Sequence, residues 1–407
     1  KDIFINWNTF WKGNGVMGDD GVIIPNEEFL NKLFMRKSGL PILKVPFPDG
    51  TEKPYWNTFY QKINEDKSIL GQMDVNAKSE LVWDFYQETL EKVSGFGGKI
   101  LRLDAFAYLH KEIGQSNFFN KPGTWDYLER IKQIAQKNHL TLLPEIHAEY
   151  GLHLHDEVAK EGYYIYDFFL PGLTIHTIET CNCKALITWA KEIVTKGYKT
   201  VNMLGCHDGI PVLDLKGKEV DGVYNKGLLL DEEIESIMSK IMERGGRVKN
   251  LYGPSGKKIS YYQVNATFFS ALGEDEQKLL LARAIQMFMP GIPQIWYLDI
   301  FACKNDYQAA DKGGNAGHKE INRTTLTMHD IEVGVKSNIV QYQLQLLRLR
   351  NTSKAFSGNI RINENSDKVI DIKWINQNEV AHLSANLKTY TFTINYSEAG
   401  ENKILSF

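Results

Sequence analysis

Short apolar segments that each end in a polar cluster alternate with amphipathic helices along the middle of the chain. Three of these segments are KILRLDAF (99–106), LTLLPEIH (140–147) and KTVNMLGCHDG (199–209), and YYIYDFFL (163–170) is a further apolar strand candidate. Apolar residues at helical spacing mark the segment 78–94, and Thr124 is placed to cap a further helix. Short strands that alternate with helices predict parallel βαβ units and an α/β fold.

The remaining parts of the chain have a different texture. Residues 1–75 carry scattered aromatics, glycines and prolines without a sustained period, and 210–262 are irregular apart from an acidic helix at 231–243. In the last part of the chain, segments such as VIDIKWI and YTFTINY alternate apolar and polar side chains. This alternation predicts a small antiparallel β domain at 355–407.

Length and composition limit the function classes. A chain of 407 residues is too long for one compact core, so we expect two or three domains. The 47 basic and 50 acidic residues nearly balance, which gives no indication of a nucleic-acid or anionic-membrane partner. No apolar run approaches the roughly 20 residues of a membrane helix, and the opening KDIFINWNTFW is not a signal peptide. We therefore expect a cytoplasmic protein.

Two short patterns resemble metal-binding motifs but lack the remaining ligands. Cys181 and Cys183 form a CxC pair without a second thiol pair at ligand spacing. The segment HLHD, which contains His153, His155 and Asp156, resembles a pair of metal ligands, but no motif places a further ligand for it. We therefore predict neither a metal site nor a cofactor.

The polar clusters at the strand ends carry the chemistry of this sequence. They pair Arg102 with Asp104, Glu145 with His147, and His207 with Asp208. In a β/α barrel the C-terminal strand ends open onto the active site, and a charge buried there is costly unless something uses or pairs it. Retaining glycoside chemistry needs two carboxyl groups about 5 Å apart, and neighbouring strands lie about 4.8 Å apart.

Each carboxylate also has a structural interpretation. Asp104 could simply pair with Arg102, and Glu145 could cap the helix that follows it. For any one of these residues alone, the structural and the catalytic interpretations are about equally supported. Three carboxylates in the same strand-end position together favour catalysis.

Several longer motifs carry a resemblance to a known family. LRLDAFAY, LLPEIHAEY, CHDGI, YYQVNATFFSALG and PGIPQIWYL, in this order, resemble the successive motifs of the sucrose phosphorylases, a branch of the α-amylase clan. The resemblance implies a (β/α)8 TIM barrel with an inserted domain B and a small C-terminal antiparallel β domain. Residues 1–75 would then be the remainder of domain B and the return to the barrel. Residues 76–354 would hold barrel strands four to eight, with an irregular insertion at about 210–262, and residues 355–407 the C-terminal domain.

The resemblance also implies roles for the three carboxylates. Asp104 would be the nucleophile that forms a β-glucosyl-enzyme, and Glu145 would protonate the leaving oxygen and later act as the base. Asp208 would stabilise the oxocarbenium-like transition state. Arg102 and His207 match positions that hold the nucleophile and the glucose hydroxyls.

Further residues match substrate-binding positions of the family. Gln263 belongs to the YQVN motif, and Lys319 stands in the glucose-contacting position that the family fills with Arg. Tyr108 and Phe118 match aromatic positions that line the sugar pocket, although aromatic side chains are more often part of a core. Arg36 and Lys37 match a basic stretch of domain B, where a phosphate contact and a solvated charge pair are both open.

Besides Lys319, the sequence departs from the family at two further places. The early D-x-x-x-N-H motif has no counterpart, since the chain's Asn138-His139 pair ends a helix. We therefore expect the first barrel strands to lie outside this chain, and the chain alone to be poorly soluble or inactive. Near the acceptor side, Ser260 replaces an Asp of the family and follows Lys257 and Lys258. These cations suit an anionic leaving group such as fructose 6-phosphate or glycerate.

The expected function is that of a retaining α-glucoside phosphorylase. It would transfer glucosyl from sucrose or a sucrose-like α-glucoside to inorganic phosphate through a covalent β-glucosyl-Asp intermediate. The carboxylates alone do not separate this activity from hydrolysis or transglucosylation, because all three share the intermediate. Sucrose 6-phosphate phosphorylase, glucosylglycerate phosphorylase and a non-catalytic remnant of the fold also stay open, and so does a homodimer as the assembly.

Overall fold

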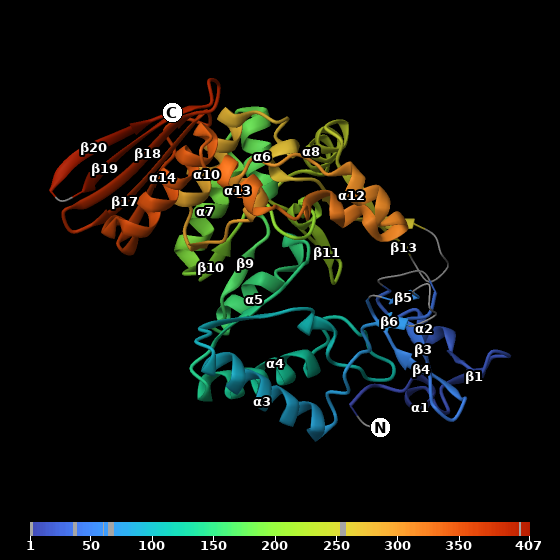
Figure 1. Ribbon diagram of the computed structural model, residues 1–407. Coiled ribbons are helices and arrows are strands. Elements are labelled where there is room, and N and C mark those ends of the chain that lie inside the picture. Colours follow the sequence, from blue (N-terminus) through green and yellow to red (C-terminus); the bar gives the residue numbers. More distant parts are fainter. Residues whose placement is uncertain (1–2, 36–38, 60, 64–68, 253–257, 399) are drawn as a thin grey trace. The chain divides into compact units, whose positions relative to one another are not determined.

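The computed structural model describes residues 3–35, 39–59, 61–63, 69–252, 258–398 and 400–407 (Figure 1). The chain divides into two compact units. The first comprises Lys1–Ile146 with Asn250–Ser260, and the second comprises His147–Lys249 with Tyr261–Phe407. Within the part of the chain that the structure describes, no helix combines the length and the apolar character needed to cross a bilayer.

The start of the first unit consists of antiparallel hairpins around a tryptophan cluster. Trp7, Trp11 and Trp56 are almost completely buried, and the ring centroids of Trp7 and Trp56 lie 4.8 Å apart. The strands are only three to five residues long, too short to leave a periodic pattern in the sequence. The elements are α1 (Trp7–Phe10), β1 (Gly15–Met17), β2 (Ile23–Pro25), α2 (Glu27–Leu30), β3 (Ile42–Pro46), β4 (Glu52–Trp56), β5 (Gln61–Ile63) and β6 (Ile69–Gly71).

The rest of the first unit is a βαβ unit. The strands β7 (Ile100–Leu103) and β8 (Thr141–Pro144) pair in parallel, and α4 (Gly123–Lys137) connects them. The helix α3 (Glu80–Gly95) precedes β7 and packs against α4. This arrangement confirms the predicted alternation of strand and helix.

The predicted cap of α4 is wrong. We expected Thr124 to stand before the helix, but α4 begins at Gly123, and Thr124 lies buried in its first turn. The backbone N–H of Thr124 donates to the carbonyl of Asn120 at 2.8 Å. A hydroxyl one residue inside the helix cannot accept from the second or third helical N–H as an N-cap side chain does.

The second unit is built on three parallel strands. In the order β15 (Ile292–Pro293), β10 (Thr200–Asn202), β9 (Ile165–Asp167), they place Val201 of β10 opposite Tyr166 and Ile292. Three helices of this unit bury many apolar side chains and form its core: α6 (Leu170–Thr180), α7 (Lys184–Lys196) and α10 (Glu276–Phe288). The apolar segment 163–170 therefore gives a shorter strand than predicted, because its last residue already begins α6.

Shorter elements connect these strands and helices. The acidic helix expected at 231–243 is confirmed as α8 (Asp231–Glu243). The others are η1 (Phe106–Tyr108), η2 (Tyr150–Leu152), α5 (Leu154–Lys160), η3 (Val212–Leu215), β11 (Lys218–Val220), β12 (Val223–Asn225), β13 (Arg247–Tyr252), β14 (Lys258–Asn265), α9 (Phe268–Ala271), α11 (Tyr297–Ile300), α12 (Tyr307–Lys312), η4 (Gly314–Asn322), α13 (Met328–Gly334), α14 (Asn338–Thr352) and η5 (Lys354–Ser357).

The end of the chain is an antiparallel sheet, as predicted. Its five strands follow one another in sequence order, and the strands at the red end of the ribbon in Figure 1 belong to it. Ile370, Ile372 and Trp374 alternate with less buried neighbours on one strand, which leaves one face for the core. The strands are β16 (Asn359–Asn363), β17 (Val369–Asn376), β18 (Glu379–Asn386), β19 (Thr391–Glu398) and β20 (Glu401–Ser406).

The CxC pair holds this sheet in place. The thiol of Cys181 donates to the carbonyl of Leu387 at 3.1 Å, and the backbone N–H of Cys183 donates to the carbonyl of Asp367 at 2.8 Å. Both cysteines are free thiols. Their contacts are therefore structural ones to the C-terminal sheet.

Candidate active site

The ends of β7 and β8 bring Arg102, Asp104 and Glu145 together. The Nη2 atom of Arg102 lies 3.2 Å from Oδ1 of Asp104 and 2.8 Å from Oε2 of Glu145. Because both oxygens contact the same nitrogen, they lie at most about 6 Å apart, and this bound is compatible with the roughly 5–5.5 Å between the two carboxyl groups of retaining glycosidases. The three residues that the sequence placed at these strand ends thus form one cluster.

The local backbone explains why Asp104 faces outward. The strand ends at Leu103, and the next residue but one, Ala105, has a left-handed backbone with φ of 53°. The chain turns there into η1, so Asp104 projects at the turn with 73% of its side chain exposed. Glu145 continues β8 by one residue, donating its N–H to the carbonyl of Leu103 at 3.0 Å. Only 11% of its side chain is exposed.

Tyr108 and Phe118 lie in an aromatic cluster close to Asp104 in sequence. Their ring centroids are 4.9 Å apart, and Phe118 also stacks on Phe34 at 4.8 Å. Phe59 meets the ring of Tyr108 edge-on at 4.9 Å. Tyr108 is buried, so packing accounts for much of its surface. Whether either ring also contacts a sugar stays a prediction.

In the second unit, Asp208 is held by two cations. Its Oδ1 atom lies 2.5 Å from Nζ of Lys319 and 3.3 Å from Nη2 of Arg323, and 13% of its side chain is exposed. Burial alone would raise the pKa of Asp208, but the charge and the hydrogen bond of Lys319, together with the charges of His207 and His147, outweigh that effect. The pKa therefore lies below its ordinary value. His207 directly precedes Asp208 in the chain, with Nε2 at 3.9 Å from Oδ2 of Asp208.

Gln263 lies beside the same loop. The strand β14 passes over Gly209 and Ile210, and Ile210 bridges Val264. A Cβ atom on Gly209 would lie 2.8 Å from the carbonyl oxygen of Val264 and 2.8 Å from Cγ of Gln263. The glycine of CHDGI is therefore required by the close approach of the YYQVN segment, and this approach buries Gln263 almost completely.

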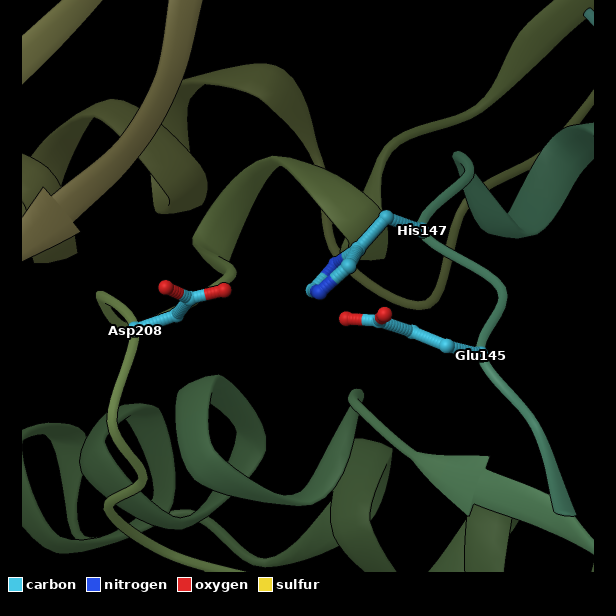
Figure 2. Close-up of side chains that lie close together, drawn as sticks. All are labelled: Glu145, His147 and Asp208. Carbon is cyan, nitrogen blue, oxygen red and sulfur yellow. The ribbon is translucent and has the colours of Figure 1, made fainter. Parts of the chain in front are cut away.

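His147 is oriented by a carboxylate and an aromatic ring. Its Nδ1 atom lies 3.1 Å from Oδ2 of Asp214, and its ring stacks on Phe168 with centroids 3.8 Å apart. Figure 2 shows the imidazole of His147 and the carboxylate of Asp208 turned toward the same space. Glu145, labelled in the same figure, precedes His147 by two residues and belongs to the first unit.

The HLHD segment has structural contacts. Burial lowers the pKa of His155 to about 4, so this imidazole is neutral at ordinary pH. Asp156 pairs with Lys160 at 2.7 Å and with Lys196 at 3.3 Å. These ion pairs account for the carboxylate without a metal.

Three of the expected basic residues, Arg36, Lys37 and Lys257, lie outside the described residues. The side chains of Lys258 and Ser260 are likewise outside what the structure describes. Their proposed contacts with phosphate or with the leaving group stay predictions.

Sequence reasoning missed several residues of the second cluster. Arg323 contacts Asp208 directly, and Asn322 bonds to the backbone on both sides of His207. Both belong to the segment HKEINR (318–323), and Lys319, which the sequence analysis named, lies in the same segment. Asp214 gave no signal, because nothing in the sequence marks it as the partner of His147.

The fold and the clusters of charged residues can now be compared with those of known proteins. A solved structure of sucrose 6F-phosphate phosphorylase from Thermoanaerobacter thermosaccharolyticum superposes with a TM-score of 0.84 at 32% identity, covering 100% of this chain and 77% of that one. An α-amylase from H. orenii shares the fold alone, with a TM-score of 0.53 at 14% identity. The chain thus has the TIM-barrel fold of the α-amylase clan with a C-terminal antiparallel sheet.

Sequence comparison narrows the class to one family. The chain is 54% identical to the sucrose 6(F)-phosphate phosphorylase of Ilumatobacter coccineus, over 100% of its own length and 78% of that protein. It is 32% identical to the sucrose phosphorylase of Streptococcus mutans, over 97% of its length and 76% of that protein. No protein-family model matches the chain. The chain belongs to the sucrose phosphorylase family of glycosyl-transferring enzymes, as the motifs predicted.

Proposed function

We propose that this enzyme catalyses the retaining phosphorolysis of sucrose 6(F)-phosphate. It would transfer the glucosyl group to inorganic phosphate, forming α-glucose 1-phosphate and releasing fructose 6-phosphate. One observation carries the choice of substrate: the chain is 54% identical, over its whole length, to a protein named for that activity. Sucrose itself is the second candidate, because a sucrose phosphorylase is 32% identical to the chain.

In the first step the two carboxyl groups of the first unit would divide the work. A carboxylate oxygen of Asp104 attacks the anomeric carbon of glucose while the bond to the fructosyl oxygen breaks. The carboxylic acid of Glu145 gives its proton to that oxygen, so the oxygen leaves as a neutral hydroxyl group of fructose 6-phosphate and not as an alkoxide. The exposure of Asp104 and the partial burial of Glu145 support this assignment, because the attacking group must reach the substrate.

In the second step phosphate would replace the sugar. An oxygen of inorganic phosphate attacks the anomeric carbon from the opposite face, the bond to Asp104 breaks, and Glu145 takes back a proton. Two inversions retain the α configuration. Arg102, which contacts both carboxylates, would keep Asp104 ionised as a nucleophile must be.

Asp208 would stabilise the positive charge that develops on the glucose ring. A carboxylate can do this only while it is ionised, and its lowered pKa supports that state. Lys319 already contacts Asp208 at 2.5 Å. We therefore assign Lys319 first to holding Asp208, and a contact with glucose would come in addition.

The remaining parts of the proposal concern organisation and location. Residues 1–75 would belong to domain B, residues 76–354 to the barrel and residues 355–407 to the C-terminal domain. We place the enzyme in the cytoplasm, because its substrates would be sugar phosphates and inorganic phosphate. Light scattering of the purified enzyme would decide between a monomer and a homodimer.

The substrate proposal is tested with a panel of α-glucosides. The enzyme is incubated with inorganic phosphate and either sucrose 6(F)-phosphate, sucrose or glucosylglycerate, and the release of α-glucose 1-phosphate is followed. We expect kcat/KM for sucrose 6(F)-phosphate to exceed that for sucrose at least about tenfold, a difference of about 1.4 kcal/mol. Reactions without phosphate measure hydrolysis. If sucrose is turned over as efficiently, the enzyme is a sucrose phosphorylase.

A further inference from the structure

The loop that carries Asp208 is held by side chains from one later segment of the chain. The loop follows β10 and consists of residues 203–208. The N–H of Gly205 donates to Oδ2 of Asp299 at 2.9 Å, and Nε of Arg323 donates to the carbonyl of His207 at 2.7 Å. A Cβ atom on Gly205 would lie 2.6 Å from the Asp299 carboxylate, so only glycine allows this approach.

Asn322 makes the most specific of these contacts. Its Nδ2 atom donates to the carbonyl of Cys206 at 2.8 Å and to the carbonyl of Asp208 at 2.7 Å. Both partners are carbonyl oxygens, so the atom that faces them must be the amide nitrogen with its two N–H groups. One side chain thus holds the backbone at Cys206 and at Asp208, the two residues that flank His207.

The position of Asn322 is itself fixed. Its side chain is 2% exposed, and the preceding Ile321 is completely buried. The indole Nε1 of Trp296 donates to the backbone carbonyl of Asn322 at 3.1 Å. A rigid side chain that bonds to the backbone of Asp208 transmits its own position to the carboxylate, whereas Lys319 and Arg323 bond to the carboxylate directly.

We propose that Asn322 is a positioning residue for Asp208. By holding the carbonyls of Cys206 and Asp208, it sets where the Asp208 carboxylate stands relative to the glucose ring. Charge stabilisation in a transition state depends on groups that are already in place, and a displacement of about 1 Å can cost about 100-fold in rate. The inference rests on the proposed role of Asp208.

The test uses Asn322→Asp, which keeps the shape of the side chain but replaces both N–H donors by an oxygen. We expect kcat on α-glucosyl fluoride to fall about tenfold to 100-fold, with KM little changed. The melting temperature should also fall, because a buried oxygen would then face the carbonyls of Cys206 and Asp208. α-Glucosyl fluoride makes the readout independent of the natural leaving group. Asn305→Asp is the matched control, because the Asn305 side chain accepts from Thr267 at 2.8 Å through an oxygen that Asp keeps.

A double-mutant cycle separates positioning from a merely structural role. If Asn322 acts through Asp208, Asn322→Asp in the background of Asp208→Asn should cause little further loss. Additive losses, or an unchanged kcat in Asn322→Asp, would overturn the inference. If Asn322→Asp does not fold, Asn322→Ser retains one donor and must show the same coupling. Full activity of Asp208→Asn would overturn the role of Asp208 and this inference with it, whereas an inactive Asp208→Asn beside a fully active Asn322→Asp overturns only the inference.

Discussion

The two strand-end clusters have opposite balances of charge. In the first unit one guanidinium, that of Arg102, is shared by the carboxylates of Asp104 and Glu145. In the second unit a single carboxylate, that of Asp208, is flanked by Lys319 and Arg323. The exposed fractions do not follow this division, because 73% of the Asp104 side chain is exposed, against 11% for Glu145 and 13% for Asp208.

The difference in charge balance indicates two different roles for a carboxyl group. A cluster with more carboxylates than cations has one group that can attack and another that can carry a proton. A cluster with more cations than carboxylates holds its carboxylate ionised and immobile, as electrostatic stabilisation requires. The arrangement therefore supports Asp104 and Glu145 as the reacting pair and Asp208 as a fixed charge.

The largest effect is expected from Asp104→Asn. An amide cannot form the glucosyl ester, so turnover should fall by several orders of magnitude on every substrate. Asp208→Asn should cost less, about 10²–10³ in kcat, because it removes stabilisation and not a bond. If Asp208→Asn lowers kcat more than Asp104→Asn does, the roles assigned to the two clusters are wrong. Steady-state kinetics of both variants on α-glucosyl fluoride decide this.

Glu145→Gln should give a smaller effect that depends on the leaving group. General acid catalysis contributes about 10²–10⁴ in rate for a leaving group that needs a proton. Fluoride needs little protonation, so the formation of the glucosyl-enzyme from α-glucosyl fluoride should be largely spared. Equal losses on α-glucosyl fluoride and on the natural substrate would remove Glu145 from the role of the acid. Pre-steady-state measurement of fluoride release isolates this step.

Asp167 is a fourth strand-end carboxylate, and it lies outside both clusters. It ends β9 but is completely buried, and its Oδ1 accepts from Nε1 of Trp189 at 2.9 Å and from the N–H of Leu170 at 3.0 Å. Burial raises the pKa of Asp167 from 3.8 to about 7. Between these values the unfolded chain is ionised while the folded chain keeps its proton, so this group makes stability fall as pH rises from about 4 to 7.

Asp167→Asn should remove that pH dependence and leave kcat unchanged. The Asn Oδ1 atom can still accept from both donors, so the fold should persist. Melting temperatures measured across pH 4–8 should converge at low pH, with the variant the more stable protein above about pH 7. A large loss of kcat in this variant would mean that position at a strand end matters more than exposure and cation partners.

Much of the fold could be predicted because it rests on local patterns. The alternation of apolar strands with helices and the period of two in the last segment are visible over short windows, and both are confirmed. The hairpins of residues 15–71 were not predicted, since strands of three to five residues leave no period. Their core depends on Trp7, Trp11 and Trp56, which come together only in three dimensions.

Those residues of the candidate site that lie at strand ends or in recognisable motifs could be predicted from the sequence. The clusters of Arg102 with Asp104 and of His207 with Asp208 were expected from residues adjacent in sequence. The contacts of Asn322 and Arg323 span more than a hundred residues and depend on how the chain returns after β15. Position at a strand end also could not distinguish Asp167 from Asp104, because burial decides which carboxylate can meet a substrate.

The most direct test of the account is to trap the covalent intermediate. Glu145→Gln is incubated with α-glucosyl fluoride in the absence of phosphate, digested at low pH and examined by tandem mass spectrometry. We expect one added glucosyl group on the peptide containing Asp104. A glucosyl group on Asp208, or a variant that turns over without any covalent adduct, would contradict the division of labour between the two clusters.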